Sequence, residues 1–96
     1  MNALTIDYHG LGAADEEELR RHEPCIQQAA GGRADLEFIW RADGRPGRRG
    51  LKLVVRRRGH DWPPPSRCLR IPEERLGGLA PADLAHGVGD AVSGLP

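Results

Sequence analysis

Arginines crowded between residues 41 and 58 are the side chains best suited to chemistry in this 96-residue chain. A guanidinium group pairs with two oxygens at once, so a cluster of arginines is typical of surfaces that bind carboxylates or phosphates. Lys52 is the only lysine. That imbalance is what the codon bias of a GC-rich genome produces, and we expect a bacterial source.

Trp62 opens a Trp-Pro-Pro-Pro run directly after the arginines. Successive prolines donate no ladder hydrogen bonds, so this run predicts an extended connector. A preformed segment loses little entropy on docking, and Trp and Arg dominate the binding energy of interfaces. The alternative is a stiff linker whose Trp62 fills the edge of the core. The predicted partner-binding residues are Arg41, Arg45, Arg48, Arg49, Arg56, Arg58 and Trp62.

Cysteine and histidine offer a second kind of chemistry. His22, Cys25, His60 and Cys68 could complete a tetrahedral zinc site, and a Cys25 thiolate at a helix N-terminus could act as a nucleophile. Their spacing matches no zinc-finger or catalytic motif, and a buried cysteine usually behaves as a small apolar residue. We therefore predict no metal, no cofactor and no enzymatic activity.

Charge is segregated along the chain although the formal net charge is zero. Acidic residues outnumber basic ones by eight to three over residues 1–40, whereas basic residues prevail by eleven to four over residues 41–75. A neutral whole argues against long-range steering onto nucleic acid. A segregated dipole suits docking on a partner in one orientation. The alternative is that the arginines pair with the chain's own acidic helix.

A β-hairpin over residues 35–58 is the element that must position the arginines. Two runs rich in β-branched and aromatic residues flank a Gly/Pro-rich turn, which is typical of a hairpin. Alternation predicts one apolar face on each strand and an outward face that includes Ile39 and Arg56. The cross-strand register is expected to place an acidic residue of the first strand opposite Arg56 or Arg58.

The N-terminal third predicts a strand followed by a broken helix. Apolar and polar residues alternate over residues 4–9, and an acidic run then opens a helix whose inward face repeats every three or four residues. Pro24 removes a backbone donor, so we expect a kink or two short helices there. The expected inward residues of this helical stretch are Leu19, His22, Ile26 and Ala30.

The C-terminal part predicts a short strand over residues 68–71, one helical turn over 72–76 and a final helix that begins at Pro81. The whole is expected to be one α+β domain, residues 1–96, with a small, mostly antiparallel sheet in the order β-α-β-β-β-α and helices on one face, in two layers. This order is similar to that of double-stranded-RNA-binding and ferredoxin-like domains, without a shared motif.

We therefore expect a small, non-enzymatic protein-binding module, an adaptor, accessory subunit or regulator, that binds another protein or itself as a homodimer through a sheet edge. The alternative partner is nucleic acid, bound by the same arginines; a small Cys/His enzyme or zinc protein is a third class. With no targeting signal, no apolar run of about 20 residues and only two cysteines, a cytoplasmic location without membrane contact is expected.

Overall fold

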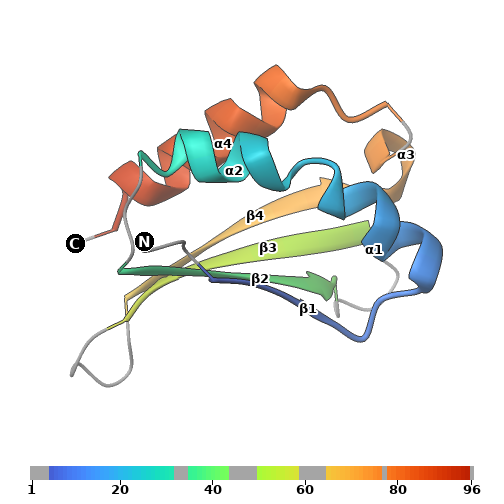
Figure 1. Cartoon of the computed structure of the whole chain (residues 1–96), viewed down its shortest axis with the longest axis horizontal. Helices are drawn as coiled ribbons and strands as arrows, with labels where there is room; N and C mark the ends of the chain where they lie inside the picture. The colour runs from blue at the N-terminus through green and yellow to red at the C-terminus, as the bar shows by residue number, and fades with distance from the viewer. Residues whose placement is uncertain (1–4, 32–34, 44–49, 59–64, 77, 96) are drawn as a thin grey trace.

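The computed structural model of the chain describes residues 5–31, 35–43, 50–58, 65–76 and 78–95. Four strands and four helices make up this part of the chain (Figure 1). The elements are β1 (Thr5–His9), α1 (Ala13–Arg20), α2 (Glu23–Ala29), β2 (Leu36–Ala42), β3 (Gly50–Arg57), β4 (Ser66–Pro72), α3 (Glu73–Leu76) and α4 (Pro81–Ser93). None of the described helices has the length and apolar character that a bilayer crossing requires.

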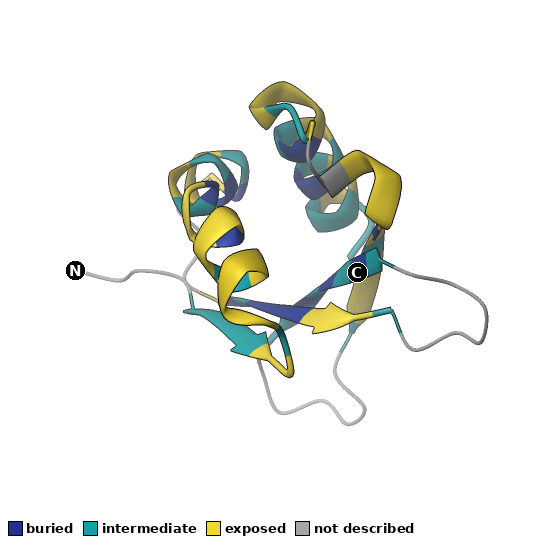
Figure 2. Cartoon of the chain, turned by 90° about the vertical axis from the view of Figure 1, so that its right-hand side faces the viewer, coloured by how far each residue is buried: buried dark blue, intermediate teal, exposed yellow. Residues whose placement is uncertain are grey.

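The strands form one mixed sheet in the order β1-β2-β3-β4. β3 pairs antiparallel with both β2 and β4, whereas β1 pairs parallel to β2. A parallel neighbour needs a crossover connection, and α1 and α2 supply it. Figure 2 shows the described helices on one side of the sheet and none of them on the other side. The α+β architecture predicted from the sequence is confirmed.

The predicted break near Pro24 is confirmed, and it divides the first helical stretch into α1 and α2. Pro24 occupies the first turn of α2, where its missing N–H leaves no helical bond unmade. The chain turns at Arg21 and His22, just before the proline. The predicted inward residues of both helices are all buried: Leu19, His22, Ile26 and Ala30.

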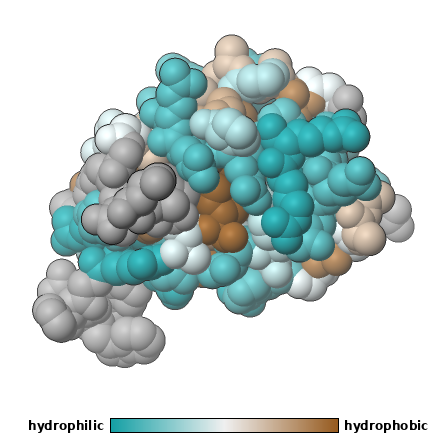
Figure 3. Space-filling model, in the orientation of Figure 1, coloured by the Kyte–Doolittle hydropathy of each residue, from teal (hydrophilic) through white to brown (hydrophobic). Residues whose placement is uncertain are grey.

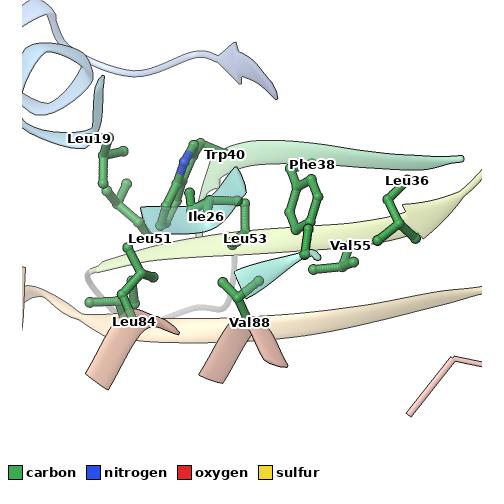
Figure 4. Packing of buried hydrophobic residues seen from close by; sticks show 12 residues of the cluster. Leu19, Ile26, Leu36, Phe38, Trp40, Leu51, Leu53, Val55, Leu84 and Val88 are labelled. Carbon is green, nitrogen blue, oxygen red and sulfur yellow. The ribbon is translucent and has the colours of Figure 1, made fainter. Parts of the chain in front are cut away.

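The core lies between the sheet and the helical layer. Phe38 and Trp40 of β2 are fully buried, and Leu53 of β3 lies beside them (Figure 4). Leu84 and Val88 extend from α4 into the same cluster. This alternation matches the predicted apolar faces of the hairpin. Strand residues that alternate with these core-facing residues project to the opposite side of the sheet. We call this side, which faces away from the described helices, the open face.

Two glycines allow close approaches that position β4 and α4. A Cβ added to Gly50, which has φ +147°, would lie 2.4 Å from the Ile71 carbonyl oxygen. Gly87 of α4 faces Leu69 of β4, whose methyl carbons lie 3.0 Å from the position a Cβ would take. The predicted helical turn after β4 begins at Glu73, one residue later than expected, because Pro72 still pairs with Gly50 as the last residue of the strand.

The surface seen in the orientation of Figure 1 is mostly hydrophilic. In Figure 3 the hydrophobic colour is concentrated in one small recess near the middle of the view, with a few smaller spots elsewhere. The large apolar side chains of the described residues are therefore committed mainly to the core between the two layers.

Candidate functional site

The open face is built from three rows of side chains that cross the strands. Cα partners of neighbouring strands project to the same face of a sheet, so the register fixes each row. The paired row is Thr5, Glu37, Arg56 and Ser66; the middle row is Asp7, Ile39, Val54 and Cys68; the cationic row is His9, Arg41, Lys52 and Arg70. Each row takes one residue from each strand.

The paired row is electrically balanced. Arg56 Nη2 donates to Glu37 Oε1 across the β2–β3 pair at 2.6 Å. The register places Glu37 directly opposite Arg56, as the sequence predicted for one of its two alternatives. A cross-strand ion pair of this kind stabilises a sheet by about 0.2–1 kcal/mol. Arg56, one of the predicted contact residues, is thus held within the molecule.

The cationic row concentrates charge of one sign. Arg41, Lys52 and Arg70 stand directly opposite one another on β2, β3 and β4, at the strand spacing of about 4.8 Å. Like charges directly opposite across strands destabilise a sheet. Among the described residues, neither Arg41 nor Lys52 makes an ion pair.

Among the described residues, Arg70 is the member of the cationic row that has a carboxylate nearby. Its Nε lies 4.0 Å from Asp43 Oδ2, at the outer limit of an ion pair. Asp43 is nearly buried, with 7% of its side chain exposed, while 44% of the Arg70 side chain remains exposed. His9 ends the row on β1 and is exposed. The row therefore presents cations to whatever approaches the open face.

The middle row is the apolar strip beside these cations. Ile39 lies on the open face by alternation, as predicted, but only 7% of it is exposed. Val54 is half-buried and Cys68 is exposed. Asp7 closes the strip at the β1 end. The open face thus changes from neutral through apolar to cationic over four residues of each strand.

The acidic helix does not neutralise the cationic row. Arg20 pairs with Glu16 and Glu23, and Arg21 pairs with Glu18, all within the helical layer. That layer covers the face of the sheet opposite to the cationic row. For the described residues, the alternative in which the hairpin arginines pair with the acidic helix is wrong, because the acidic helix carries its own arginines.

Tyr8 joins β1 to this helical charge cluster. Its hydroxyl donates a hydrogen bond to Glu23 Oε1, and the Arg20 guanidinium lies 4.6 Å from the centre of its ring. Burial and the neighbouring Glu23 carboxylate raise the pKa of Tyr8 above its ordinary value, and Arg20 opposes them more weakly. The cluster fastens the edge strand β1 to the junction of the helices.

Aromatic rings are missing from the described part of the open face. Phe38, Trp40 and Tyr8 belong to the helix-facing side, as the register and the core cluster show. Figure 4 shows Phe38 and Trp40 directed among the core side chains. Single-stranded nucleic acids are bound largely by stacking of bases on such rings. The described open face offers cations and aliphatic carbon instead.

Cys25 and Cys68 lie on opposite sides of the sheet. Cys25 lies in the helical layer, where its thiol donates to the Pro81 carbonyl oxygen at 3.1 Å and ties α2 to the start of α4. Cys68 lies on the open face, on the other side of the sheet. A zinc site that includes both is therefore ruled out by this structure. No group of three potential metal ligands occurs among the described residues, and His60 lies outside them.

The predicted contact residues fall into four groups. Arg41 lies in the cationic row; Arg58 is exposed just after β3, with its backbone N–H donating to the Asp35 carbonyl oxygen at 2.7 Å; and Arg56 is paired. Arg45, Arg48, Arg49 and Trp62 lie outside the described residues, so their part in the surface stays a prediction. Sequence reasoning left out Arg70, which the alternation of Leu69 and Ile71 with polar residues would have placed on the open side.

Comparisons with protein families, with curated proteins and with solved structures find no match to this chain. The geometry of the open face is therefore the basis on which a function can be inferred. That basis consists of Arg41 and Lys52, which make no ion pair with the described residues, the aliphatic strip beside them and the lack of described aromatic rings on that side.

Proposed function

We propose that this chain is a small, non-enzymatic protein-binding module, an adaptor, accessory subunit or regulator, whose open sheet face docks on an acidic surface of another protein. The observation that carries the proposal is the alignment of Arg41, Lys52 and Arg70 on adjacent strands. Such an alignment costs stability in the free protein. A partner that supplies carboxylates relieves that repulsion, so binding gains more than an isolated surface pair would give.

Charge alone would also suit nucleic acid, which is the second candidate. The cations favour it, since each neutralised phosphate releases counterions. The lack of described aromatic rings on the open face and the zero net charge of the chain disfavour it. An aliphatic strip beside the cations suits a protein surface better than a phosphate backbone, because phosphates gain nothing from contact with apolar carbon.

The remaining arginines extend the same surface in our proposal. Arg45, Arg48 and Arg49 belong to the segment that connects Arg41 to Lys52 along the chain, so they are close in sequence to the cationic row. Two free thiols support a reducing compartment as the place of action, and we propose the cytoplasm. Pairing of two copies through a sheet edge, at β1 or β4, stays part of the proposal.

The test compares two polyanions on the intact chain at low salt. The probes are polyglutamate and a DNA duplex of mixed sequence, titrated against the wild type and against the double variant Arg41→Gln/Lys52→Gln. The matched control, Arg21→Gln/Arg75→Gln, removes two exposed arginines from the helical side. We expect polyglutamate affinity to fall about tenfold in the first variant, equivalent to about 1.4 kcal/mol, and less than twofold in the control.

Three outcomes would overturn the proposal. Tighter binding of the DNA duplex than of polyglutamate, with an affinity that falls steeply with salt, would establish the nucleic-acid alternative. Equal losses in the two double variants, or no binding of polyglutamate at all, would remove the open face as the docking surface.

A further inference from the structure

We infer that the partner presents an amphipathic α-helix that lies across the strands of the open face, with an acidic stripe over the cationic row and an apolar stripe over the middle row. This inference rests on the proposed function, because it names the element of the acidic partner that the face accepts. It follows from the spacing of the rows rather than from charge alone.

The spacing along the cationic row matches a helix. Arg41 and Arg70 are two strands apart, which places their backbones about 9.6 Å from each other at about 4.8 Å per strand. Helix positions i and i+7 are about 10.5 Å apart, and i+3 or i+4 falls near the midpoint. Carboxylates at those three positions would meet Arg41, Lys52 and Arg70 in turn.

An extended segment fits the row less well. Side chains on one face of a strand repeat every two residues, or about 6.7 Å. Three successive carboxylates would then span about 13 Å, several ångströms beyond the reach of the three cations in register. The row therefore discriminates between a helix and a strand that carry the same charge.

The distance between adjacent rows also fits the width of a helix. Adjacent rows lie two residues apart along each strand, about 6.7 Å, so a helix about 10–12 Å wide covers both the cationic and the middle row. Val54 and Cys68 would receive its apolar stripe. Asp7 at the end of the middle row repels carboxylates, and the Glu37–Arg56 ion pair leaves no free cation in the paired row, so the acidic stripe is directed to the cationic side.

The experiment uses designed peptides and the full chain. One peptide of about 18 residues, long enough to become helical on binding, carries Glu at i, i+4, i+7 and i+11 beside a Leu stripe. The second has the same composition with Glu and Leu at alternate positions. We expect the first peptide to bind at least tenfold more tightly, to gain helicity by circular dichroism, and to shift the amide resonances of Arg41, Lys52, Val54 and Arg70.

Variants of the chain separate the two stripes. Arg41→Gln/Lys52→Gln should weaken the helical peptide about tenfold, and Val54→Thr/Cys68→Ser about three- to tenfold. The control Ala82→Ser/Ala85→Ser lies on α4 in the helical layer and should leave the affinity within twofold of the wild type.

The possible results separate the helical partner from the proposed function. Equal affinity of the two peptides, both weakened by Arg41→Gln/Lys52→Gln, would overturn the helical partner and leave the proposed function standing. Binding of polyglutamate without binding of the helical peptide would do the same. Failure of the peptides and polyglutamate alike would overturn the proposed function together with this inference.

Discussion

The contact between α4 and β4 can be tested with two glycines of the same helix. Gly87 and Gly89 lie two residues apart in α4. Each should gain about 0.8–1 kcal/mol of helix propensity when replaced by alanine. A Cβ at Gly89 meets nothing within 4 Å, whereas a Cβ at Gly87 would lie 3.0 Å from both methyl carbons of Leu69. Overpacking of that kind costs about 1–3 kcal/mol.

The expected outcome is a difference between two identical changes. Gly89→Ala should stabilise the protein by about 0.5–1 kcal/mol, and Gly87→Ala should leave it about 1–3 kcal/mol less stable than Gly89→Ala. Urea unfolding followed by tryptophan fluorescence and circular dichroism measures both free energies. Thermal midpoints should differ by roughly 4–8 °C per kcal/mol for a chain of this size.

A double-mutant cycle isolates the contact itself. If the penalty at Gly87 comes from the Leu69 side chain, Leu69→Ala should remove most of it, with a coupling energy of about 1–2 kcal/mol between the two sites. Equal stabilisation by Gly87→Ala and Gly89→Ala would refute the close approach of α4 to β4. A penalty that persists in the Leu69→Ala background would refute the assignment to this side chain.

Three further changes probe the elements that hold the open face in place. Tyr8 is the only tyrosine, so its absorbance titration reports one group; because its pKa is raised on folding, the unfolded state loses its proton first above about pH 10 and stability falls there. Tyr8→Phe should abolish that extra fall, and an ordinary tyrosine titration in the folded protein would contradict the raised pKa. Arg67→Ala removes two hydrogen bonds, at 3.3 and 3.2 Å, to the Gly94 carbonyl oxygen, so hydrogen exchange at the end of α4 should accelerate, with a loss of about 0.5–1.5 kcal/mol; unchanged exchange would show that this cap is idle. Gly50→Ala should cost about 2–4 kcal/mol by urea unfolding, since the new methyl group would overlap the Ile71 carbonyl at a φ that favours glycine, and a loss below about 1 kcal/mol would refute that overlap.

The sequence predicts the elements well where periodicity and burial agree. Alternation in β2 and β3 identified the core side of the hairpin, and the i, i+3, i+4 spacing around Ile26 identified the inward face of α2. Pro24 marked the helix break because its backbone constraint acts locally. These are properties of single segments, so no knowledge of the partner segment is needed to deduce them.

The candidate site was only partly predictable, because it depends on how separate segments align. Arg70 belongs to β4 and Arg41 to β2, and their common row exists only through the register of both strands with β3. A one-residue slip in either pairing would exchange the two faces of a strand. Composition indicated an arginine-rich surface. It could not show that Arg56 forms an ion pair with Glu37 whereas Arg41 has no such partner among the described residues.

The open face differs from the helical layer in how far its charges are paired. In the helical layer Arg20 and Arg21 pair with Glu16, Glu18 and Glu23, and in the paired row Arg56 pairs with Glu37. Charge that is compensated locally has little left for a partner. Arg41 and Lys52 lack such compensation among the described residues. Because neighbouring like charges oppose the sheet, binding of carboxylates there should raise the free energy of unfolding as well as form the complex.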